Sequence, residues 1–188
     1  MSLSRSVLAI GIGLLLVTAG AATADLKLGP FAGEWRRVES QPDEPRLESI
    51  RAALRELSWV TRTMATPILQ RSTTPPDRYE FRVDTSYPDG IALGQRDREP
   101  RPLLLDGRET EGVDKDLEVT TSALRREDGI ETRWRTSQAH GSTVFRLSND
   151  GTTLVVESLL QVTAISGVEP IRYETLFVRT PAVSSGSE

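Results

Sequence analysis

The chain has 188 residues, a formal net charge of −4 at pH 7 and no cysteine. The mild acidity argues against a nucleic-acid-binding protein, because such proteins normally carry a basic stripe. The absence of cysteine excludes disulfides and a lipid anchor on a processed N-terminal cysteine, so packing alone must hold the fold together.

Residues 1–24 have the three parts of a secretory signal peptide. A positively charged start at Arg5 precedes the uncharged run VLAIGIGLLLVTAG, and Ala22-Thr23-Ala24 supplies small residues for cleavage before Asp25. The apolar run is shorter than the roughly 20 residues that span a bilayer, so we expect cleavage rather than a retained anchor. The mature protein is then predicted to be periplasmic or secreted and not stably inserted in a membrane. We expect one domain over residues 25–180 and a flexible tail over 181–188.

The first strand of the fold is predicted in FAGEWRRVES, Phe31 to Ser40. The stretch has the pattern Phe-x-Gly-x-Trp and then becomes polar and charged. We expect structural roles for Gly33 and Trp35.

A helical insert at about residues 44–71 is predicted next. In PRLESIRAALREL, apolar residues recur at steps of three and four, which is the apolar stripe of a helix. This stripe consists of Leu47, Ile50, Leu54 and Leu57. Asp43 can cap the first turn of this helix. A second helical piece follows in SWVTRTMATPILQR, and Pro67 should kink or divide it. Its apolar members are Trp59, Val60, Met64 and Ile68.

From Tyr79 to Thr180 the sequence predicts one short strand after another. Asp-Gly pairs stand at 89–90, 106–107, 128–129 and 150–151, and such pairs favour tight turns because glycine accepts a positive φ. Between them, apolar and polar residues alternate with period two, so each strand buries one face. We therefore predict a mainly β fold, an antiparallel up-and-down β-barrel of about 8–10 strands with a helical lid after the first strand.

This order of elements resembles the calycins, which comprise the lipocalins and the fatty-acid-binding proteins. The resemblance lies in the Phe-x-Gly-x-Trp pattern, the helical pair and the strand meander, and it indicates a diverged bacterial lipocalin-like protein. A helical pair directly after the first strand is closer to the fatty-acid-binding architecture, where it covers the barrel mouth. The resemblance implies that the last strand, IRYETLFVRT, pairs with the first. It also implies that Arg179 stacks on Trp35.

The last strand departs from the fatty-acid-binding pattern. In that group an Arg-x-Tyr-x-Arg sequence holds a carboxylate, whereas this chain has Thr175, Phe177 and Arg179 at the aligned positions. Two of the three polar anchors are therefore absent. Tyr173, one inward step earlier, is a candidate substitute.

The predicted ligand-binding residues are those expected to face the inside of the sheet. They are Tyr79, Phe81, Trp134, Phe145, Ser158, Tyr173 and Arg179. The alternative is a plain filled core. Hydroxyl residues on the same inward faces favour a cavity, because a packed core would prefer larger apolar groups. These residues are Thr132, Thr143, Ser158 and Thr175. Arg179 also has two interpretations, as a ligand anchor and as a cation over Trp35.

Catalytic and metal-binding patterns are not visible in the sequence. His140 is the single histidine and sits at an expected turn, so we expect it on the surface rather than in a catalytic triad. The acidic segment DGRETEGVDKD, Asp106 to Asp116, does not have EF-hand spacing; a solvated loop is favoured over a weak calcium site. We therefore expect no enzyme activity, no cofactor and no metal.

Two functional hypotheses follow. The first is a periplasmic or secreted carrier that binds a small hydrophobic or amphipathic, fatty-acid-like ligand inside the barrel. The second is a cell-envelope interaction module with a filled barrel core, no small-molecule ligand and an envelope protein as its partner.

Overall fold

The computed structural model describes residues 27–95, 98–114 and 117–180. The predicted signal peptide at 1–24 and tail at 181–188 lie outside these residues. The elements in chain order are a 3₁₀ helix η1 (Gly29–Phe31), β1 (Gly33–Arg37), α1 (Glu44–Ala53), α2 (Trp59–Ser72), β2 (Arg78–Val83), β3 (Ile91–Gln95), β4 (Arg101–Pro102), β5 (Thr110–Asp114), β6 (Leu117–Arg125), β7 (Gly129–Arg135), β8 (Ala139–Leu147), β9 (Thr153–Val162) and β10 (Ile171–Arg179).

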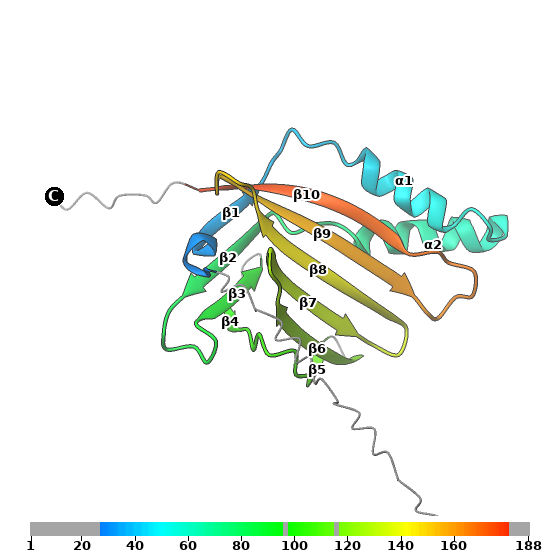
Figure 1. Cartoon of the computed structure of the whole chain (residues 1–188). Coiled ribbons are helices and arrows are strands. Elements are labelled where there is room, and N and C mark those ends of the chain that lie inside the picture. Colours follow the sequence, from blue (N-terminus) through cyan, green and yellow to red (C-terminus); the bar gives the residue numbers. More distant parts are fainter. Residues whose placement is uncertain (1–26, 96–97, 115–116, 181–188) are drawn as a thin grey trace, which may run out of the picture.

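The described strands form one antiparallel sheet in the order β4-β3-β2-β1-β10-β9-β8-β7-β6-β5. The sheet curls into a half-barrel, with both helices on the side of β10 (Figure 1). The last strand pairs with the first, and the register places Trp35 opposite Arg179. The mainly β fold with a helical pair after the first strand is confirmed.

The two edge strands, β4 and β5, are not paired with each other along their length in the described chain. Instead, the segment after β4 crosses to β6: Gly107 N donates to Ala123 O at 2.8 Å, and Arg125 N donates to Leu105 O at 3.3 Å. The strand β4 is only two residues long and includes Pro102, which lacks the N–H that a ladder needs. The half-barrel is therefore closed at one end only.

The closed end is filled by a cluster of buried apolar side chains. Phe145 is its centre, with edge-to-face contacts to Tyr79 at 5.1 Å and to Phe81 at 5.4 Å between ring centroids. Ile130 and Leu154 are fully buried in the same cluster. Such aromatic contacts stabilise a core beyond the area that they bury, so this end is a solid core.

The helices differ from the prediction at two points. Pro67 neither ends nor divides a helix: it lies inside α2, on an exposed face, where the lost backbone hydrogen bond leaves a carbonyl that water can reach. The break between the helices comes earlier, before Ser58, whose side chain accepts a hydrogen bond from Thr61 N at 3.3 Å. Asp43 precedes α1 without capping it by a side-chain hydrogen bond, because its carboxylate pairs with Arg46 instead.

A second buried cluster joins the helices to the open end of the sheet. Ile50 and Leu54 of the α1 segment are fully buried in it. From α2 only Ala65 and Leu69 are buried. The four apolar members that we singled out in α2 point to solvent: Trp59, Val60, Met64 and Ile68 are 57–76% exposed.

Candidate functional site

A cavity of about 280 Å³ lies at the open end of the half-barrel, against the end of α2. The strands β2, β3 and β7 to β10 and residues 72–76 supply its walls. Its lining combines aromatic and aliphatic side chains with hydroxyl groups. This mixture differs from the all-apolar cluster at the closed end, although both regions use the same strands.

The hydroxyl side chains of the cavity form one row across the sheet. The register places Thr132 opposite Thr143, Thr143 opposite Ser158 and Ser158 opposite Tyr173. All four side chains line the cavity. Directly opposed residues have Cβ atoms roughly 5 Å apart, so the row presents a hydroxyl on each of four consecutive strands.

The next row toward the mouth is apolar. Trp134 lies opposite Gly141 and Gly141 lies opposite Leu160. A Cβ atom added to Gly141 would come within 2.8 Å of the Trp134 ring and within 2.5 Å of Leu159 O. The indole therefore lies directly on the glycine backbone, which fixes the ring at the cavity wall.

Tyr173 supplies a half-buried phenol to the cavity. Burial raises the pKa of the Tyr173 hydroxyl above its ordinary value, and a hydrogen bond with Ser158 and the charge of Arg46 oppose that rise. The phenol is therefore neutral at physiological pH and available as a hydrogen-bond donor.

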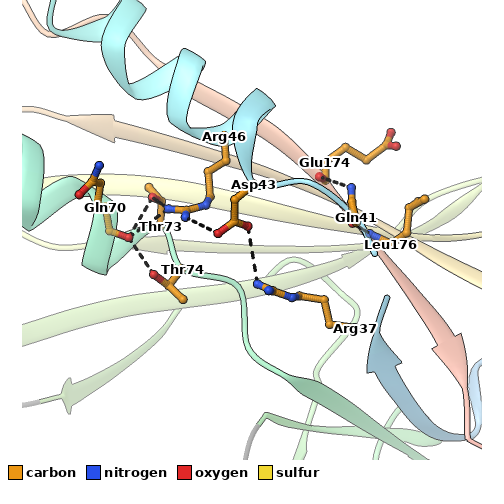
Figure 2. A network of polar contacts seen from close by, with 9 residues as sticks. All are labelled: Arg37, Gln41, Asp43, Arg46, Gln70, Thr73, Thr74, Glu174 and Leu176. Atoms are coloured by element: carbon orange, nitrogen blue, oxygen red, sulfur yellow. Dashed lines mark hydrogen bonds and ion pairs between the residues drawn. The ribbon is translucent and has the colours of Figure 1, made fainter. Parts of the chain in front are cut away.

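A polar network holds the helices at the cavity wall (Figure 2). The Arg46 guanidinium is buried; Nη1 donates to Thr73 Oγ1 and to Gln70 O, both at 3.1 Å, and Nη2 donates to Asp43 Oδ2 at 2.9 Å. Thr73 lines the cavity. Arg46 therefore ties the start of α1 to the cavity wall that follows α2, while its own Nε is buried without a partner in the described chain.

The helix α1 is also fixed to the edge of β10. The Gln41 side chain forms two hydrogen bonds with the backbone of β10, as a neighbouring strand would. Its Nε2 donates to Glu174 O at 3.1 Å, and its Oε1 accepts from Leu176 N at 2.7 Å. Ser49 Oγ accepts from Arg172 N at 2.9 Å. Figure 2 shows the Gln41 contacts beside the Arg46 network. The helical pair is therefore anchored through α1 rather than α2.

Four of the seven predicted ligand-binding residues line this cavity. They are Tyr79, Trp134, Ser158 and Tyr173. Phe81 and Phe145 are instead fully buried in the closed-end cluster, where neighbouring rings leave no free surface.

The position of Arg179 is a further correction to the predicted lining. Its guanidinium carbon lies 4.4 Å from the centre of the Trp35 ring, and its Nη atoms donate to the carbonyls of Ala32 and Pro30. The stacking implied by the calycin resemblance is therefore present. Arg179 binds to Trp35 and to the chain before it at the closed end, rather than lining the cavity. Trp35 is fully buried, and Gly33 has a φ of 117°, a backbone conformation that glycine adopts more readily than other residues.

Sequence reasoning missed the lining residues that lie outside the alternating strand pattern. Residues 72–76 reach the cavity from the turn after α2, and Gln95 reaches it from the end of β3. Arg46 was also missed. Its signal was weak, since one arginine among many gives no sign of burial.

Side chains that could hold a metal ion do not gather in the described part of the chain. Across residues 27–95, 98–114 and 117–180, no three His, Asp or Glu side chains are placed to hold one metal ion. His140 is exposed on β8. The cavity therefore offers apolar contact and hydrogen bonding. No helix within those same ranges is long and apolar enough to cross a bilayer.

Comparison with known proteins gives similar folds at low identity. A secretory abundant heat soluble protein 4 from Ramazzottius varieornatus is 8% identical, covering 80% of this chain and 95% of that one, with a TM-score of 0.46. Lipid binding protein 8 of Caenorhabditis elegans, in its apo form, is 14% identical, covering 84% and 100%, with a TM-score of 0.45. A Schistosoma mansoni fatty acid binding protein in complex with arachidonic acid is 15% identical, covering 81% and 98%, with a TM-score of 0.42.

No family model and no curated protein sequence matches the chain. The fold assignment therefore rests on the sheet order, on the pairing of β1 with β10 and on the two helices between β1 and β2. These features agree with the calycin architecture that the sequence resembles.

Proposed function

We propose that the protein is a carrier that binds a small hydrophobic or amphipathic, fatty-acid-like molecule in the cavity at the open end. The observation that carries this proposal is the cavity itself, about 280 Å³ in volume and lined by both ring surfaces and hydroxyls. Ligand sites are typically concave, mostly apolar and furnished with a few polar groups that fix orientation.

Burial of apolar ligand surface supplies the affinity in this mechanism. Contact with Trp134, Leu160 and Phe177 removes such surface from water, at about 25 cal/mol per Å². Tyr173 is a neutral donor that orients a polar group of the ligand. Ser72 at the end of α2 and residues 73–76 after it form one wall, and the helical pair that leads into this wall acts as the lid.

A fluorescent fatty acid that brightens in apolar surroundings tests the carrier function. Ser158→Phe places a ring inside the cavity. The matched control is Thr120→Phe, which places the same ring on the outer face of the sheet, because Thr120 on β6 lies opposite the outward-facing Arg135. We expect stoichiometric binding by the unchanged chain, at least about tenfold weaker binding by Ser158→Phe, and no change for Thr120→Phe. Unchanged affinity in a folded Ser158→Phe protein would contradict a ligand site in this cavity.

The outer face of α2 favours a second candidate function, a cell-envelope interaction module. Val60, Met64 and Ile68 follow one another at steps of four and are exposed, and Arg71 extends the same face by one turn. An apolar stripe with a cationic flank suits the surface of anionic lipids. The protein should co-sediment with vesicles of phosphatidylglycerol, and the double variant Met64→Ser with Ile68→Ser should no longer co-sediment with them. Equal sedimentation of that variant would contradict this role for α2.

We also propose export, with cleavage between Ala24 and Asp25. The composition of residues 1–24 supports this proposal. Intact mass measurement of the protein from periplasm and medium should give a chain that begins at Asp25. A chain that retains Met1 to Ala24 would contradict it.

A further inference from the structure

The hydroxyl row in the cavity lies between two largely apolar rows. Toward the mouth, the Trp134 row continues through Gly141 and Leu160. Toward the closed end, Ile130 lies opposite Phe145, and Phe145 lies opposite Val156. A ligand that fills the cavity along its length would therefore meet an apolar wall, then a band of hydroxyls.

The hydroxyls of this row have free hydrogen-bonding capacity. In the described part of the chain, neither Thr132 nor Thr143 has a side-chain hydrogen bond, although both are half-buried at the cavity wall. Ser158 lies opposite Tyr173, whose phenol is its polar neighbour on β10. Each hydroxyl can donate one hydrogen bond and accept two. Water or a ligand must therefore satisfy them.

We propose that the cavity selects ligands that carry a hydroxyl or carbonyl group part-way along an apolar body, over plain hydrocarbon chains. This inference rests on the carrier function. A plain chain would displace water from Thr132, Thr143 and Ser158 without replacing its hydrogen bonds, and desolvated polar groups without partners weaken binding. A ligand oxygen at that level would restore the bonds. Sites built around hydrogen bonds discriminate strongly against analogues that lack the matching group.

Two ligand pairs that differ by a single hydroxyl test this selection. The pairs are ricinoleate with oleate and β-hydroxydecanoate with decanoate, each titrated against the fluorescent fatty acid by displacement. The variant is Thr132→Val with Thr143→Val, which keeps side-chain shape and removes two hydroxyls. Thr120→Val is the matched control, because Thr120 lies opposite Arg135 and therefore on the outer face of the sheet, away from Thr132 and Thr143.

We expect the unchanged chain and Thr120→Val to prefer the hydroxylated member of at least one pair by about tenfold. In the double variant that preference should fall at least about threefold, mainly through tighter binding of the plain chain, while Ser158 keeps its hydroxyl. Equal affinity within both pairs in the unchanged chain, or a preference that is undiminished in the double variant, would overturn the selection and leave the carrier function intact. No binding of any of the four molecules would remove the carrier function and the selection with it.

Discussion

The closed end and the cavity end of the half-barrel are built from the same strands and differ in side-chain volume. On the inner face of β8, Phe145 fills the closed end and Thr143, two residues earlier, lines the cavity. On β9, Leu154 and Ser158 form a similar contrast. Smaller hydroxyl side chains at one level of the sheet leave space where larger apolar side chains at the other level fill it.

This difference separates stability from function within one sheet. The closed end gains dispersion and hydrophobic stabilisation from close packing. The cavity end forgoes part of that stabilisation, since its hydroxyls meet open space. We therefore expect mutations at the closed end to act on folding and mutations at the cavity end to act on binding.

The largest effect should come from Phe145→Ala. The ring is fully buried and makes edge-to-face contacts with Tyr79 and Phe81, so its loss should lower the free energy of unfolding by about 3–5 kcal/mol. Denaturant unfolding monitored by circular dichroism measures this. A loss below about 1 kcal/mol would mean that the closed end is not the solid part of the molecule.

Arg179→Met should have the next largest effect. The variant keeps an apolar stem over Trp35 but loses the cation over its ring and the hydrogen bonds to Pro30 and Ala32. We expect a loss of about 1–2 kcal/mol in the same unfolding measurement, because the side chain is exposed. Affinity for the fluorescent fatty acid should stay unchanged. Loss of fatty-acid affinity without loss of stability would show that Arg179 is part of the ligand site.

Glu131, on the outer face of the sheet, should make the free energy of unfolding depend on pH. Its buried carboxylate accepts hydrogen bonds from Arg133 and Arg126 at 2.6–3.0 Å, and these arginines hold its pKa below the ordinary 4.5. The stabilisation is therefore present above about pH 4.5 and is lost as pH falls through the lowered pKa. Glu131→Gln should cost about 1 kcal/mol at pH 7.

The control for Glu131→Gln is the same comparison under acid conditions. As the pH falls through the lowered pKa of Glu131, the two proteins should become more nearly equal in unfolding free energy, since the wild-type carboxylate then takes up a proton. A difference that stays constant through an acid titration in which this carboxylate is seen to be protonated would contradict an ionic origin for the stabilisation.

The smallest effect on stability should come from Thr143→Val. Its hydroxyl has no side-chain partner in the described chain, so removing it should change the free energy of unfolding by no more than about 0.5 kcal/mol. Thr143→Val and Phe145→Ala change neighbouring residues on one face of β8, so they compare the cavity end and the closed end most directly. A loss above about 2 kcal/mol would show that Thr143 is part of a packed core.

The sequence predicts the sheet well, because alternation and Asp-Gly turns are local signals. Alternation predicts an inward orientation for Tyr79, Trp134 and Ser158, and all three line the cavity. The same alternation could not separate Phe145 from Trp134, since it gives the face of a residue and not its level along the barrel. That level depends on the register between strands distant in the sequence.

The helices show a different limit of prediction. A stripe of apolar residues predicts a helix, and both helices formed, but the stripe does not say which face the rest of the protein covers. In α2, Ala65 and Leu69 are buried while Trp59, Val60, Met64 and Ile68 face water. The role of Arg46 likewise depends on a tertiary contact with Thr73, which no local pattern encodes.

Native mass spectrometry of residues 25–188, purified without detergent and then incubated with a bacterial lipid extract, tests the ligand cavity most directly. We predict one added mass of a few hundred daltons per chain, present in Thr120→Phe and lost in Ser158→Phe. A bare protein mass before and after incubation would contradict the carrier function, and the space beside Thr143 and Ser158 would then hold only water.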